Sequence, residues 1–158
     1  MGGAARVTDE EPTATDILEV LEAHSSRRGF AERWRAFMRD CAVPLLATLP
    51  QDAGDWVAAA DEFEAGRLSE AALTQCRVRA WTLHDAIQNS PQRPTSLLSG
   101  LQVAMYRLWP TSDDWYVEAV YFLEACREAG LKDEFLLGML RERIASELPP
   151  DVAGRSSP

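Results

Sequence analysis

Apolar residues recur at three- and four-residue spacing along the chain from Thr15 to Leu148. This is the period of an amphipathic α-helix, and no stretch alternates between apolar and polar residues as a half-buried strand would. Glycine or proline marks nearly every gap between the apolar runs, as expected where helices end. The pattern therefore predicts an all-α fold, a compact single-domain bundle of about six to seven helices built from antiparallel helical hairpins.

The residues that begin and end the apolar runs place the expected helices. Ser69 is a favourable N-cap, and Gly66 and Gly130 suit helix ends because glycine readily adopts left-handed conformations. Pro44 lacks a backbone N–H, so it predicts a kink or break in the second helix. The expected helices span about 15–24, 29–49, 52–65, 69–89, 95–108, 115–129 and 132–148.

Three of these helices carry informative stripes. The second has a strong apolar stripe, formed by Phe30, Trp34, Phe37, Met38, Cys41 and Leu45. The sixth is apolar over most of its circumference, which favours a place at the centre of the bundle. Its polar stripe comprises Glu118, Tyr121, Glu124 and Glu128. The seventh is expected to turn five residues inward, namely Phe135, Leu136, Leu140, Ile144 and Leu148.

The two ends of the chain differ from the rest. Residues 1–13 and 149–158 are rich in small residues and proline, so we expect a disordered lead and tail around a helical domain at 14–148. No apolar signal-peptide core or 18-residue apolar run is visible, which predicts a cytoplasmic protein. Cys41, Cys76 and Cys126 are then expected to be buried reduced thiols.

The charge balance narrows the choice of partner. The chain has 25 Asp and Glu against 16 Lys and Arg, a formal net charge of −9. This excess argues against nucleic acid, whose phosphates need clustered basic residues, and favours a basic protein partner. The main basic run is Arg27, Arg28, Arg33, Arg35 and Arg39. We expect these arginines to pair with acids of the first or third helix.

Catalytic and metal-binding patterns are weak. The chain has two histidines, no Glu-x-x-His pair and no glycine-rich phosphate loop, so we expect no metal ion and no cofactor. His84 lies on the apolar stripe of the fourth helix and is followed by Asp85. A hydrogen-bonded core histidine is the simpler interpretation, and a catalytic base in a bundle pocket remains the alternative.

Two sets of residues are candidates for partner binding. One is the acidic side of the third helix, comprising Asp55, Asp61, Glu62 and Glu64. The other is an acidic loop between aromatic residues, a composition typical of binding hot spots. This second set is Trp109, Asp113, Asp114, Trp115 and Tyr116. Each set also has a purely structural explanation. The first would be a solvated helix face, and in the second the two tryptophans would close the end of the bundle.

Three functional hypotheses follow. The first is a non-catalytic protein-binding helical domain, such as an acidic inhibitor or an immunity-type protein that neutralises a basic partner such as a toxin. Small acidic proteins of bacterial toxin–immunity pairs have this profile, which is an analogy of composition alone. The second is a structural or regulatory module in a larger or homo-oligomeric complex, and the third is an enzyme with a bundle pocket near His84.

Overall fold

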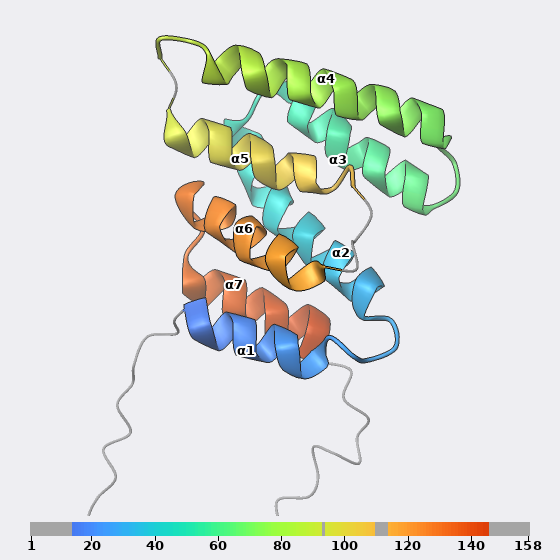
Figure 1. Ribbon diagram of the computed structural model, residues 1–158, viewed down its shortest axis with the longest axis vertical. Coiled ribbons are helices and arrows are strands. Elements are labelled where there is room, and N and C mark those ends of the chain that lie inside the picture. Colours follow the sequence, from blue (N-terminus) through green and yellow to red (C-terminus); the bar gives the residue numbers. More distant parts are fainter. Residues whose placement is uncertain (1–13, 93, 110–113, 146–158) are drawn as a thin grey trace, which may run out of the picture.

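The prediction of an all-α fold is confirmed. The computed structural model describes residues 14–92, 94–109 and 114–145, and over these residues the chain forms seven α-helices and no strand (Figure 1). The expected lead at 1–13 and tail at 149–158 lie outside the described residues. The helices are α1 (Ala14–His24), α2 (Phe30–Ala42), α3 (Gln51–Glu64), α4 (Glu70–Gln88), α5 (Thr95–Tyr106), α6 (Trp115–Glu128) and α7 (Asp133–Leu140).

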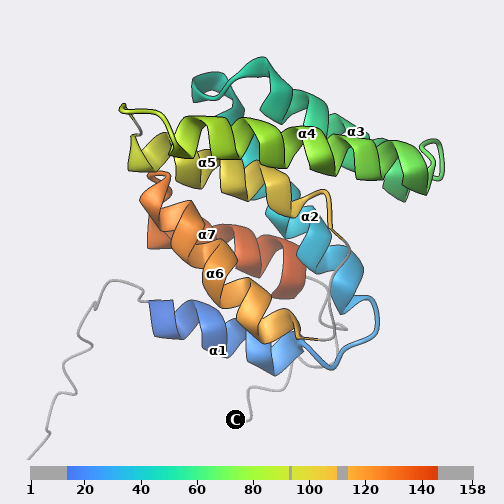
Figure 2. The ribbon, with the colours of Figure 1, turned by 45° about the horizontal axis from the view of Figure 1, so that its top comes forward.

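The helices are stacked in three tiers along the long axis of the molecule. The α3–α4 hairpin forms one end, α2, α5 and α6 form the middle, and α1 and α7 pack together at the other end (Figures 1 and 2). Helix α5 contacts α2, α3, α4 and α6, so it connects the α3–α4 hairpin to the rest of the bundle. The site described below lies on one side of α5.

Local signals in the sequence fix most helix boundaries. The Ser69 hydroxyl accepts a hydrogen bond from the Ala72 amide at 3.2 Å and caps α4. Gly66 has φ +75° and Gly130 has φ +104°, and the amide that follows each glycine closes the last turn of its helix. At Pro44 the α-helix gives way to a 3-10 helix, η1 (Val43–Thr48), which confirms the predicted break.

The core centres on an aromatic cluster that joins α2 to α5 and α6. The Trp34 ring lies 5.3 Å from Phe37 and 5.6 Å from Phe122, measured between centroids. Phe122 also meets Tyr106 edge to face at 5.4 Å. Trp34, Phe37 and Phe122 are fully buried, so the apolar stripe predicted for the second helix is confirmed at the centre of the fold.

Two expectations about packing are wrong. Helix α6 lies in the middle tier but is not enclosed, because Tyr116 and Val117, which lie outside its predicted polar stripe, are exposed. Phe135 is also exposed, because the buried stripe of α7 runs through Leu136 and Leu140, about 100° away around the helix.

The last helix is shorter than expected. Its α-helical part ends at Leu140 and continues as a π-helical turn, η2 (Arg141–Ala145). Ile144 is buried within that turn, as the sequence predicts. Leu148 lies outside the described residues.

Candidate functional site

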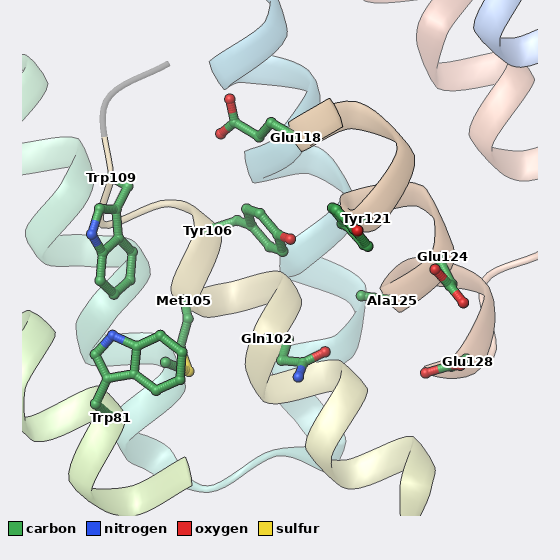
Figure 3. A pocket seen from close by; sticks show the side chains of 10 residues that line it. All are labelled: Trp81, Gln102, Met105, Tyr106, Trp109, Glu118, Tyr121, Glu124, Ala125 and Glu128. Carbon is green, nitrogen blue, oxygen red and sulfur yellow. The ribbon is translucent and has the colours of Figure 1, made fainter. Parts of the chain in front are cut away.

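A cleft opens between α4, the end of α5 and α6. It has a volume of about 530 Å³, within the range of pockets that hold small-molecule ligands. Figure 3 shows the residues that line it, with tryptophans on one side and glutamates of α6 on the other. Its lining comprises Trp81, Gln102, Met105, Tyr106, Trp109, Glu118, Tyr121, Glu124, Ala125 and Glu128.

The aromatic side of the cleft is built around Trp81 and Trp109, here called the tryptophan pair. Trp81 projects from α4 and is 50% exposed, and its ring meets that of Trp109 edge to face at 6.1 Å. The Arg77 guanidinium lies 5.6 Å from the Trp109 centroid, and its Nε donates to the Leu108 carbonyl at 2.6 Å. Arg77 thus fixes Trp109 through a cation–π contact within the chain.

The acidic side of the cleft is formed by Glu118, Glu124 and Glu128 of α6, here called the glutamate row. At ~1.5 Å rise per residue, the row extends ~15 Å along the helix axis. The Ser99 hydroxyl donates to Glu128 Oε2 at 2.8 Å. Among the described residues, no hydrogen bond or ion pair engages the Glu124 carboxylate, which is exposed. Glu124 therefore offers a negative charge to a ligand in the cleft.

The tyrosines lie between these two sides. Tyr106 is half-buried at the middle of the cleft, and Tyr121 projects beside it from α6 with 59% exposure (Figure 3). Burial raises the pKa of the Tyr106 hydroxyl, and the negative charge of Glu118 raises it further. The second of these causes reflects the negative charge on the α6 side of the cleft.

His84 adjoins the cleft without lining it. Its side chain is nearly fully buried, its ring contacts Trp81 edge to face at 5.6 Å, and its Nε2 lies 3.3 Å from the Gln102 amide nitrogen. The amide nitrogen can only donate, so Nε2 is the acceptor in this hydrogen bond. Nδ1 is 3.7 Å from Asp85 Oδ1. In this arrangement His84 is a hydrogen-bonded core residue that supports Trp81 and Gln102.

Two of the predicted partner-binding acids on α3 are engaged within the chain. Arg107, at the end of α5, has a side chain only 1% exposed. It donates to Asp61 Oδ1 at 2.8 Å, to Glu64 Oε1 at 2.9 Å and to the Arg35 carbonyl at 3.2 Å. Arg39 of α2 donates to Asp61 Oδ2 at 2.9 Å. We call Arg107, Asp61, Glu64 and Arg39 the Arg107 network.

The remaining acids of that set lie at the surface. Glu62 forms a two-pronged ion pair with Arg67, which lowers the pKa of the Glu62 carboxyl. Asp55 is exposed and, together with Arg79, lines a smaller cavity between α3 and α4. The expected pairing of the arginine run with α3 is confirmed for Arg39, which hydrogen-bonds Asp61, and for Arg35, whose Nε lies 3.8 Å from Glu64 Oε1.

The predicted aromatic loop is divided between two neighbourhoods. Trp109 belongs to the cleft, whereas Trp115 packs against Phe30 at 5.3 Å and against Tyr116 at 5.6 Å. Among the described residues no ring contact joins Trp109 to Trp115. Asp114 and Tyr116 are exposed, and Asp113 lies outside the described residues.

The sequence pattern leaves open a bundle pocket near His84, but it predicts neither which helices form the cleft nor the role of Arg107. One signal was available: Trp81 falls off the apolar stripe of α4, and tryptophan is enriched in binding hot spots. The polar stripe of α6 was predicted, and its members Tyr121, Glu124 and Glu128 are exposed as expected. Only the tertiary fold brings α4 and α6 together at one cleft, so the sequence pattern of either helix alone could not reveal it.

Neither known kinds of site nor known relatives identify a function for the cleft. Within the described ranges, no three His, Cys, Asp or Glu side chains lie together as metal ligands would. No helix described there is both long and apolar enough to span a bilayer. Comparisons with protein-family models, curated proteins and solved structures gave no match. The geometry of the cleft therefore carries the functional interpretation.

Proposed function

We propose that this chain is a non-catalytic protein-binding domain whose cleft receives a basic segment of a partner protein. The observation that carries the proposal is the tryptophan pair facing the glutamate row across an open cleft. Aromatic faces attract cations through their quadrupole, and carboxylates add charge-assisted hydrogen bonds. Positive charge is the ligand property that both sides of the cleft share.

The overall charge supports the same choice. A net charge of −9 steers basic partners toward the molecule and speeds their association at low salt. An acidic inhibitor or immunity-type protein that neutralises a basic partner, such as a toxin, is the form of this function that we favour. In that role the cleft would hold a basic segment of the partner, and binding itself would block the partner's activity.

Affinity capture with matched variants tests the proposal. The tagged full chain, the E124Q/E128Q variant and the control E19Q/E22Q are incubated with a lysate of the organism that encodes the protein. Both variants lose two negative charges, but Glu19 and Glu22 are exposed on α1, in the tier farthest from α4. Glutamine keeps an oxygen that can accept the Ser99 hydrogen bond, so the fold should be preserved.

Each outcome of the capture has a definite meaning. We expect one basic protein that the wild type and the control retain, that E124Q/E128Q loses, and that is released as salt rises. Retention of the same proteins by all three chains, or the absence of any retained protein, would show that the proposed function is wrong.

A further inference from the structure

We propose that the cleft recognises arginine side chains of the partner's basic segment in preference to lysine side chains. This inference rests on the proposed function and adds the chemistry of the occupant. It follows from the exposed Glu124 carboxylate, from the ring surfaces opposite it, and from a guanidinium–tryptophan contact already present in the chain.

Glu124 offers a carboxylate to an incoming cation. It is exposed at the cleft, whereas Glu128 already accepts a hydrogen bond from Ser99 and Glu118 is partly buried. Glu118 lies six residues before Glu124, which places it about 120° away around α6.

The aromatic residues favour arginine over lysine. A guanidinium is planar, is more weakly hydrated than an ammonium, stacks on aromatic rings and can pair with a carboxylate through two parallel hydrogen bonds. Trp81 presents a half-exposed indole at the cleft, opposite the glutamate row. The aliphatic stem of an arginine would lie against Trp81 and Met105, with its head directed toward Glu124.

The chain contains an internal precedent for this contact. Arg77 holds its guanidinium 5.6 Å from the Trp109 centroid, at the edge of the same cleft. The Trp109 indole is therefore already part of a guanidinium contact, and Trp81 stands next to it with its ring 6.1 Å away. An incoming arginine would extend this arrangement from Trp109 to Trp81.

Peptide titration tests the inference with the full chain. The probes are acetyl-Arg-Ala-Arg-Ala-Arg-amide, its lysine counterpart of equal charge, and the linear polyamine spermine. Binding is measured by calorimetry, and by tryptophan fluorescence because Trp81 is half exposed. The arginine peptide should bind about threefold more tightly than the lysine peptide, and more tightly than spermine.

Variants locate the binding to the cleft. E124Q/E128Q should weaken binding of the arginine peptide about tenfold, whereas the control E19Q/E22Q should change it less than about twofold. W81A should weaken it about threefold. Trp81 is half exposed, so this variant should keep the far-ultraviolet circular dichroism spectrum and thermal midpoint of the wild type.

The results separate this inference from the proposed function. Equal or tighter binding of the lysine peptide or of spermine, or equal loss in the two double variants, would overturn the choice of an arginine segment. If affinity capture depends on Glu124 and Glu128 while no peptide binds, this inference fails and the proposed function stands. If the peptide binds as expected and capture does not depend on these residues, the proposed function fails.

Discussion

Changes on opposite sides of the Arg107 network should have unequal effects on stability. R107M removes the buried cation and keeps an unbranched apolar side chain in its place. D61N/E64Q keeps the cation and neutralises both carboxylates that contact it, at 2.8 and 2.9 Å. Both variants break the two ion pairs of Arg107, and D61N/E64Q also removes the more exposed pairs of Asp61 with Arg39 and of Glu64 with Arg35. Exposed pairs of this kind contribute about 1 kcal/mol or less each, so a larger difference between the variants reports which charge the fold leaves without compensation.

The exposures of the partners set the expected magnitudes. After R107M, Asp61 and Glu64 remain 32% and 36% exposed, so water can solvate both carboxylates, and Arg39 still pairs with Asp61. We expect this variant to lose about 1–2 kcal/mol, close to the value of the lost hydrogen bonds. D61N/E64Q instead leaves a guanidinium at 1% exposure without an anion, which should cost about 3–5 kcal/mol.

Urea unfolding followed by circular dichroism measures the difference, because urea, unlike guanidinium chloride, does not screen ion pairs. E62Q is the matched control: it removes an acid of the same helix whose only described ion-pair partner, Arg67, is at the surface, and it should change the unfolding free energy little. If R107M proves the less stable of the two network variants, then desolvation of the guanidinium does not govern this site and the reasoning is wrong.

Three further predictions concern the core and the cleft. W34A and F122A should each lower the unfolding free energy by about 3–5 kcal/mol in the same urea assay, because both side chains are fully buried. Burial and Glu118 raise the pKa of Tyr106, so the fold favours its protonated form. Stability from this residue is complete below the unfolded pKa of about 10 and is lost as pH rises through the folded value, so wild type should lose stability relative to Y106F as pH rises above about 10. H84A should lower the thermal midpoint without abolishing any reaction; loss of turnover with the fold intact would instead establish a catalytic role for His84.

Helix identity was predictable because it depends on nearby residues. The apolar spacing of Trp34, Phe37 and Met38 fixes one face of α2, and Pro44 ends that helix through its missing N–H. Ser69 and Gly66 act within a few residues of themselves, as N-cap and as left-handed helix end. Such local signals can be recognised in the sequence because they do not depend on the tertiary fold.

The environment of each face was less predictable because it depends on distant helices. Val117 and Phe135 are as apolar as their buried neighbours, and only the placement of α5 and α1 leaves Val117 exposed. Asp61 and Glu64 read as a free acidic face because their partner Arg107 is 46 and 43 residues away in the chain. Periodicity reports which residues share a face, and it carries no information about what that face meets.

The same limit explains where the candidate site lies. The acids of α3 and α6 look alike in the sequence, but the fold gives them different surroundings. Asp61 and Glu64 of α3 pair with the buried Arg107, whereas Glu124 of α6 faces an open cleft. Helix α5 borders both regions, with Arg107 on one face and Tyr106 on the next. The acids of α3 thus fix the position of α5, and α5 contributes Gln102, Met105 and Tyr106 to the lining of the cleft. The negative charge available to a basic partner therefore lies along α6. For this reason we assign the proposed binding surface to the glutamate row and not to α3.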